Sequence, residues 1–160
     1  MKKILIALDY NPTAQHILEA GYELARSMGA EVILMHVVAD YTYYSSLDYS
    51  PILGFDQFSN LGAMQLDSVT QLENAANEYL EHLKAQFGNP SIKTLIKDGD
   101  AGEGIVEASD NLGVDVVVLG SHSRRGLDKI LMGSVAEKVL RKSKIPLYII
   151  PVSEKDKAKI

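Results

Sequence analysis

The stretch that decides the fold is GSHSRRGLDKILMGSVAEKVL, from Gly120 to Leu140. It follows the apolar run VDVVVL, and a second Gly-Ser pair, Gly133 and Ser134, opens a segment with helical periodicity. A buried strand that leads through a loop into a helix is typical of proteins in which helices alternate with parallel strands. The rest of the chain repeats this alternation.

Five apolar, β-branched runs alternate with segments of helical periodicity. They are KILIALD (3–9), AEVILMHVV (30–38), SIKTLIK (91–97), VDVVVLG (114–120) and IPLYIIP (145–151). Runs this apolar suit strands that are buried on both faces, and their alternation with helices indicates parallel pairing. We therefore predict an α/β fold with helices packed on a parallel sheet.

Four helices are expected between these strands. The first has Pro12 near its start and Gly29 at its end, the second runs from about residue 65 to 87, and the third follows DGDAGEG and ends near Leu112. The fourth is SVAEKVLRK (134–142), in which we expect three residues to face the core: Val135, Val139 and Leu140.

Length and composition bound the class of protein. The chain has 160 residues, 46% of them hydrophobic, so we expect one domain at residues 1–152 and a frayed polar tail at 153–160. A net charge of −5 with scattered basic residues argues against nucleic-acid binding. Asp9 interrupts the first apolar run too early for a secretory signal and no membrane-length segment follows, so we expect a cytoplasmic protein with no membrane partner.

Cysteine is absent, which excludes disulfides, thiolate chemistry and cysteine-based zinc sites. The four histidines, His16, His36, His82 and His122, do not have metal-ligand spacing. We therefore predict no metal site built from the protein alone.

One long segment, at about residues 39–63, has neither helical nor strand periodicity and is rich in tyrosine. A long loop inside a compact domain is usually functional or mobile. Two readings stay open. The tyrosines form a lid over a flat ligand, or the segment is a partly ordered excursion that packs on its own domain or on a partner.

The loop from Gly120 to Gly133, which we call the glycine loop, suggests a binding site for phosphates. Ligands of open parallel sheets bind beyond the carboxyl ends of the strands, where the strand order reverses, and Asp9 and Gly120 both follow strands that can meet there. The small residues of the loop let main-chain amides approach phosphate oxygens, and the first turn of the helix at Ser134 favours an anion. The alternative is ordinary turn and cap chemistry.

The segment GSHSRRGLDKILMGSVAEKVLRKSKIPLYIIP resembles the C-terminal signature of the universal stress protein family, and MKKILIALDYNPTA and EVILMHVV resemble its first two strands. This resemblance implies a single open five-stranded parallel sheet of order 3-2-1-4-5 with helices on both faces, the Rossmann-like architecture of adenine nucleotide alpha-hydrolase-like proteins. The family's ATP-binding members carry glycine, two residues, glycine, nine residues, then glycine and serine or threonine.

Ser123 is the departure from that pattern, because it stands where the second glycine should be. If the family glycine has a positive φ, serine there is strained by about 1 kcal/mol, which a folded loop can absorb. If phosphate approaches closer than a Cβ permits, serine weakens or abolishes binding. In a third reading the Ser123 hydroxyl supplies another phosphate donor.

The resemblance also assigns residues to the site. It implies that Ala7, Leu8 and Asp9 line the pocket, with Asp9 near the ribose or near a phosphate-bound cation such as Mg²⁺, and that the Val37 main chain meets adenine. From sequence alone, Asp9 reads equally as a turn cap and Val37 as a core residue. The phosphate-binding set is Gly120, Ser121, His122, Ser123, Arg124, Gly133, Ser134 and Val135. We assign no catalytic residue.

Two functions follow from these features. The first is a stress-response regulatory protein that binds ATP, AMP or another adenine nucleotide and hydrolyses ATP slowly at most. The alternative is an interaction module with a vestigial pocket, which Ser123 favours. A related synthetase-like or sulfurylase-like enzyme would carry an SGGxDS loop or an HxGH motif, and a Walker loop would end in GK[ST], but the sequence has none of these.

The last apolar run lies between Pro146 and Pro151. An apolar edge strand invites pairing with a copy of itself. The family resemblance likewise implies a homodimer through this strand, whereas the alternative is an edge covered by the polar tail.

Overall fold

The computed structural model of the chain describes residues 1–10, 13–38, 69–121 and 132–152. The elements in these residues are, in order, β1 (Lys3–Ala7), α1 (Ala14–Met28), β2 (Glu31–Val38), α3 (Val69–Ala85), β3 (Lys93–Asp98), α4 (Ala101–Leu112), β4 (Val116–Gly120), α5 (Ser134–Lys142) and β5 (Leu147–Ile150). The predicted tyrosine-rich segment and polar tail lie outside the described residues.

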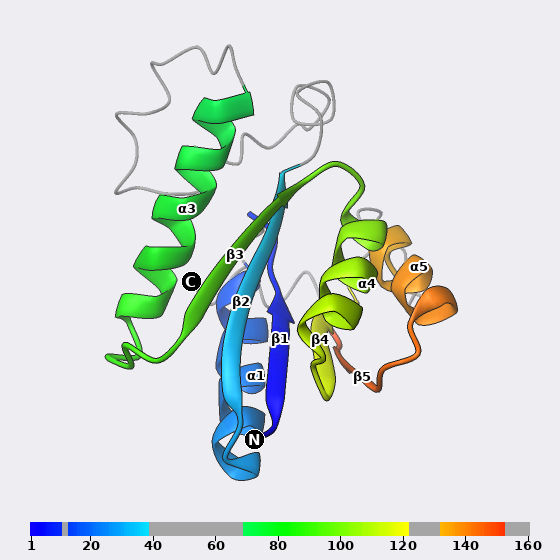
Figure 1. The fold of residues 1–160 in the computed structure, drawn as a ribbon, viewed down its shortest axis with the longest axis horizontal. Coiled ribbons are helices and arrows are strands. Elements are labelled where there is room, and N and C mark those ends of the chain that lie inside the picture. The colour runs from blue at the N-terminus through cyan, green and yellow to red at the C-terminus, as the bar shows by residue number, and fades with distance from the viewer. Residues whose placement is uncertain (11–12, 39–68, 122–131, 153–160) are drawn as a thin grey trace.

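The strands form one five-stranded parallel sheet of order β3-β2-β1-β4-β5, drawn in Figure 1. Each neighbouring pair is parallel, and β1 lies at the centre between β2 and β4. Parallel strands need crossover connections, which the helices supply. The predicted α/β class and the strand order 3-2-1-4-5 are therefore confirmed.

Helices cover both faces of the sheet. The residues of β1 alternate between two cores, because successive side chains in a strand point to opposite faces. Ile4 and Ile6 lie in the core with residues of α1 and α3, whereas Leu5 lies in the core with residues of α4 and α5. This division gives the three-layer sandwich that the apolar runs predict (Figure 1).

The predicted end of α1 is confirmed at Gly29. This residue has a φ of 60°, in the left-handed region that glycine adopts without strain, and its amide donates to the carbonyls of Ala25 and Arg26. The next amide, of Ala30, donates to the Ala25 carbonyl (2.9 Å). These bonds satisfy the last carbonyls of the helix and turn the chain into β2.

The second helix, predicted at about residues 65–87, ends two residues earlier than predicted. It ends at Ala85, and residues 65–68 lie outside the described part of the chain. The amides of Gln86, Phe87 and Gly88 donate to carbonyls three residues back, so the chain tightens into a turn that closes at Gly88, with a φ of 57°.

One expectation about α5 is wrong. Leu140 was expected to face the core, but its side chain is 51% exposed. The buried positions of α5 are Ala136 and Val139, which are three residues apart on one face, and Val135 is half-buried. Because this buried stripe is narrow, Leu140 falls outside it.

Candidate functional site

The reversal of strand order lies between β1 and β4. From β1 the chain leads through α1 to β2 and β3 on one side, and β4 and β5 lie on the other. Ile6 of β1 is level with Val118 of β4, so the two strands end together at the same edge of the sheet. An open parallel sheet binds its ligands in the crevice outside such a point.

The two described ends of the glycine loop lie at this edge of the sheet. The buried Ser121 follows β4, and its amide donates to the Ile150 carbonyl of β5 (3.0 Å). The Ser121 carbonyl accepts from the amide of Gly133 (3.3 Å), so the two ends of the loop are held together. Three residues of the predicted phosphate-binding set, His122, Ser123 and Arg124, lie in the loop at 122–131 and outside the described residues.

Helix α5 begins directly at the end of the loop. Gly133 is its N-cap in an extended conformation (φ −60°, ψ 153°), and the first intrahelical bond runs from the Glu137 amide to the Gly133 carbonyl (2.9 Å). The amides of Ser134 and Val135 therefore belong to the first turn, where main-chain donors lack intrahelical acceptors and the helix dipole favours an anion.

Contacts with α4 hold the orientation of α5. Lys138 bonds to Asp100, the N-cap of α4, at 2.8 Å, and Lys142 pairs with Glu103. The ammonium group of Lys138 and the Glu103 amide lower the pKa of the Asp100 carboxyl, and Asp100 raises the pKa of Lys138. Gly102 permits this approach, because a Cβ there would lie 2.6 Å from Lys138 Cδ.

The end of β1 is held by three hydrogen bonds. The Leu8 amide donates to the Met35 carbonyl (2.8 Å), His36 Nδ1 donates to the Leu8 carbonyl (2.8 Å), and the Tyr79 hydroxyl donates to the Asp9 carbonyl (3.0 Å). Asp9 itself is exposed. Asp9 therefore lies at the edge of the sheet where β1 ends, on a main chain that its neighbours hold in place.

Three aromatic rings pack together at the end of β1. We call Tyr10, His36 and Tyr79 the aromatic cluster. The ring centroids of Tyr10 and His36 are 4.4 Å apart, and those of Tyr10 and Tyr79 are 5.1 Å apart. Burial lowers the pKa of His36, against the opposing effects of the Leu8 carbonyl and the Asp9 charge. The imidazole is therefore neutral near pH 7.

Sequence reasoning missed the part that His36 and Tyr79 play here. His36 gives one signal, since it is a polar residue within the apolar run EVILMHVV. Tyr79 gives none, because in the sequence it is one more apolar residue of a helical stripe. Their contacts with the end of β1 join segments that are 28 and 70 residues apart.

Val37 lies beyond the last paired residue of β1. The final register pair of these two strands is Ala7 with Met35, and on the other side of β2 the Val38 carbonyl accepts from the Gly99 amide. Main-chain groups of alternate residues in a strand point to opposite neighbours, so those of Val37 point toward the β1 side. Its side chain is buried and packs toward Gly104.

Gly120 is required for packing. A Cβ at this position would lie 2.5 Å from Ile17 Cδ1 of α1 and 3.3 Å from Val152 Cγ2. From the sequence, Gly120 is explained by close approach of the main chain to phosphate. In the structure, the packing of Ile17 already explains why this position is glycine. Gly120 alone is therefore weak support for a ligand.

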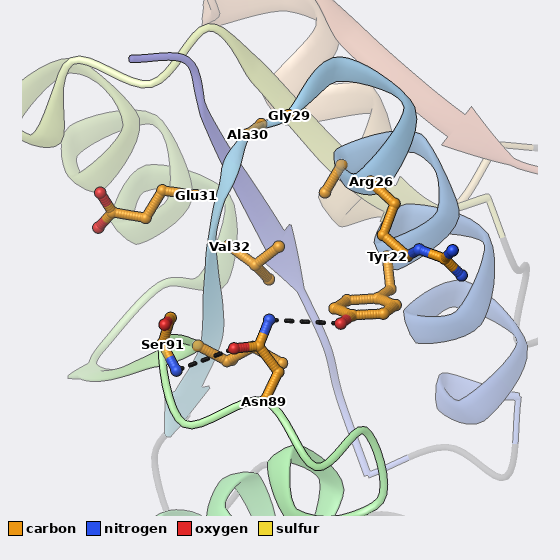
Figure 2. Close-up of a pocket in the computed structure, with 10 residues that line it drawn as sticks. Tyr22, Arg26, Gly29, Ala30, Glu31, Val32, Asn89 and Ser91 are labelled. Carbon is orange, nitrogen blue, oxygen red and sulfur yellow. Dashed lines mark hydrogen bonds between the residues drawn. The ribbon is translucent and has the colours of Figure 1, made fainter.

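A separate cavity of about 110 Å³ lies at the opposite end of the sheet, where β2 begins (Figure 2). Three residues of its lining bond to one another, because Asn89 Nδ2 donates to the Tyr22 hydroxyl (3.3 Å) and the Ser91 amide donates to Asn89 Oδ1 (3.0 Å). In Figure 2 the Glu31 carboxylate lies on the far side of β2 from Tyr22. This cavity is not part of the predicted site.

The described residues contain neither a metal-binding cluster nor a membrane-spanning helix. No three His, Cys, Asp or Glu side chains gather there in a group that could hold a metal ion. Among the helices of residues 13–38, 69–121 and 132–152, none is long and apolar enough to cross a membrane.

The structure brings the described candidate residues into two groups at one edge of the sheet. Ala7, Leu8 and Asp9 end β1, with Val37 at the end of the adjacent β2. The second group is Gly120, Ser121, Gly133, Ser134 and Val135, at the end of β4 and the start of α5. These features define an open, doubly wound α/β protein with an exposed carboxylate after β1 and a helix start suited to anions after β4.

A sequence model of the universal stress protein family matches residues 1–151, and the chain belongs to that family. It is 29% identical over 152 residues to universal stress protein MJ0577 of Methanocaldococcus jannaschii, an alignment that covers 93% of this chain and 94% of that relative. It is also 29% identical over 157 residues to universal stress protein A of Escherichia coli, with 97% of each chain covered.

Solved structures have the same fold. The structure of hypothetical protein MJ0577 matches with a TM-score of 0.69 and 28% identity, covering 96% of this chain and 97% of that one. A universal stress protein crystallised in complex with cAMP matches with a TM-score of 0.56 and 18% identity, covering 93% of this chain and 95% of that one. At that identity the second match concerns the fold alone.

Proposed function

We propose that this protein binds an adenine nucleotide, ATP or AMP, in the crevice between the ends of β1 and β4, and that it acts as a regulatory protein in a stress response. The observation that carries the proposal is the start of α5. The bond between the Gly133 amide and the Ser121 carbonyl holds the first turn of this helix beside the end of β4. Its main-chain amides are then donors for phosphate oxygens.

Asp9 is the proposed partner of the ribose or of a cation on the phosphates. Mg²⁺ is commonly held by one or two carboxylates together with substrate phosphates, so a single exposed carboxylate fits a cation that arrives with the nucleotide. The described residues offer no cluster that would hold such an ion by itself. Mg²⁺ would therefore strengthen nucleotide binding through Asp9.

Val37 is the proposed partner of the base. Its main-chain groups point to the side of β1, beyond the last residue of that strand. An adenine edge offers both a donor and an acceptor to such groups. The family supports an adenine ligand, since a member of the same fold crystallised with cAMP.

The test is to denature the purified protein, identify any released small molecule by mass spectrometry, and titrate ATP and AMP by calorimetry. Ser123→Gly restores the family motif, and Ser91→Gly, at an exposed site at the opposite end of the sheet, is the matched control. We expect nucleotide binding by the wild type, a changed affinity in Ser123→Gly and no change in Ser91→Gly. Absence of binding in the wild type and in Ser123→Gly would refute the proposal.

The second candidate is an interaction module with a vestigial pocket. A specific observation favours it, because the packing of Ile17 accounts for Gly120 without a ligand. Packing would thus retain Gly120 even in a protein that has lost phosphate binding, and Ser123 in place of the second glycine is consistent with such a loss. A wild-type protein that binds nothing until Ser123 becomes glycine would select this candidate.

A homodimer through β5 is also proposed. This strand lies at the edge of the sheet, pairs with β4 on one side, and carries Tyr148, which is 44% exposed. Sedimentation equilibrium should give a dimer for the wild type and a monomer for Tyr148→Glu. The control Asn111→Glu, on the exposed end of α4, should stay dimeric. A wild-type monomer would contradict this part of the proposal.

A further inference from the structure

The two carbonyls that follow β1 both accept hydrogen bonds from side chains of other elements. The Leu8 carbonyl accepts from His36 of β2, and the Asp9 carbonyl accepts from Tyr79 of α3. The bond from His36 is buried, whereas the bond from Tyr79 is part-buried, because Tyr79 is 4% exposed but Asp9 is an exposed residue. Buried bonds are electrostatically stronger than exposed ones.

The bond from His36 lies where the pairing of β1 with β2 ends. In a parallel ladder the Val37 amide would next donate to the Leu8 carbonyl, because Ala7 pairs with Met35 and the Leu8 amide still donates to the Met35 carbonyl. His36 Nδ1 donates to the Leu8 carbonyl at 2.8 Å, at the point where β1 has ended. The His36 side chain thus bonds to the Leu8 carbonyl where the ladder between β1 and β2 stops, so that residue 9 is not paired with Val37.

Tyr79 holds the next residue from the other direction. Its hydroxyl reaches the Asp9 carbonyl from α3, while its ring packs on Tyr10 at 5.1 Å. The main chain of residues 8–10 is therefore fixed by β2 and by α3 together. The Asp9 carboxylate is the exposed group on this fixed segment.

We propose that His36 and Tyr79 are positioning residues that hold the main chain of Leu8 and Asp9, and that Tyr79 thereby sets the position of the Asp9 carboxylate toward a nucleotide-bound cation. The identity of that ligand rests on the proposed function, whereas the hold on the main chain does not. Helix α3 accordingly contributes to the site through Asp9, without touching the ligand.

The first experiment uses the unliganded full chain and measures amide hydrogen exchange by NMR. Tyr79→Phe keeps the ring and removes the hydroxyl. We expect the Leu8 amide, which bonds to Met35, to exchange about 5-fold faster, since a hydrogen bond of this kind contributes a factor of that order. The Glu31 amide, bonded to the Lys2 carbonyl at the opposite end of the same strands, is the internal reference and should not change.

The second experiment titrates Mg²⁺-ATP by calorimetry into the wild type, Tyr79→Phe, Asp9→Asn and the double variant. If Tyr79 acts through Asp9, Tyr79→Phe weakens binding about 5-fold in the wild type and has little effect in the Asp9→Asn background. Tyr22→Phe removes a tyrosine hydroxyl at the far end of the sheet, where it accepts from Asn89, and should bind like the wild type.

Each result decides a different statement. An unchanged Leu8 exchange rate in Tyr79→Phe would overturn the inference, as would an equal loss of affinity in both Asp9 backgrounds or no loss in either. If the wild type binds no Mg²⁺-ATP or AMP, the proposed function fails, and the exchange rate of Leu8 alone then supports or overturns the hold on the main chain. Faster exchange with a loss that depends on Asp9 supports the inference in full.

Discussion

Replacing Gly120 with alanine is expected to destabilise the protein through the packing of α1 on β4. The added Cβ would lie 2.5 Å from Ile17 Cδ1, which is about 1.0–1.5 Å closer than the roughly 3.5–4.0 Å at which carbon atoms attract. Ile17 is 1% exposed, so its side chain has no solvent to move into. Overpacking of this kind costs about 1–3 kcal/mol, and we expect a loss in that range.

The variant Ile17→Val isolates the cause, because it deletes the methyl group that would collide. Alone it should cost about 0.5–1.5 kcal/mol as a large-to-small change in the core. In its background the added cost of Gly120→Ala should fall below about 1 kcal/mol, although contacts of 3.3 Å to Ile17 Cγ1 and Val152 Cγ2 remain.

Urea unfolding followed by circular dichroism measures these free energies. The control is Ile33→Val, the same chemical change in the core on the other face of the sheet, which should leave the cost of Gly120→Ala unchanged. The reasoning is refuted if Gly120→Ala is neutral, or if it costs the same in the Ile17→Val and wild-type backgrounds. Gly120 would then need another explanation, such as close approach of a ligand.

Three further predictions concern charged groups. Burial holds the pKa of His36 below its usual value, so protonation favours the unfolded chain. The free energy of unfolding should therefore fall as the pH drops below about 6.5, by up to about 1.4 kcal/mol per pH unit until the folded pKa is reached. If urea unfolding shows the same dependence of this free energy on pH in His36→Asn, the prediction is contradicted. Asp100→Ala should lower the free energy of unfolding by about 0.5–2 kcal/mol in chemical denaturation, because it removes the acceptor for the Glu103 amide at the start of α4. Asp100→Asn keeps an acceptor and should be about as stable as the wild type. Equal losses of stability in the two variants would exclude the helix cap as the cause. Gly102→Ala should push Lys138 aside and raise the pKa of Asp100 toward its ordinary value, as measured by NMR, and an unchanged pKa would show that the ion pair survives.

The order and type of the elements could be predicted from the sequence because they depend on local patterns. The five apolar runs correspond to the five strands, and Gly29 ends α1 with a positive φ as its position suggests. The spacing of Gly120, Gly133 and Ser134 indicates the family for the same reason, because it is a pattern within one short segment. The pattern failed where burial depends on which neighbours are present. Leu140 lies on the helical stripe predicted from the sequence, but it is 51% exposed in the structure.

The candidate site could be predicted only in part. The residues that follow β1 and β4 were recognisable, because carboxyl ends of parallel strands meet at one edge of a sheet. The aromatic cluster was not, since no local pattern joins Tyr79 to Asp9 across 70 residues. The packing reason for Gly120 was equally hidden, because it depends on where Ile17 of α1 comes to lie.

The sequence by itself therefore determined the α/β class, the identity of the strands and the residues that end them, because hydrophobic period and glycine placement act over a few neighbouring residues. Only the tertiary structure decided which distant groups contact the residues of the candidate site. Hydrogen bonds from His36 and Tyr79 to the end of β1, and the contact of Ile17 with Gly120, form when separate elements pack together. Such contacts join residues far apart in the chain, so no local sequence pattern predicts them.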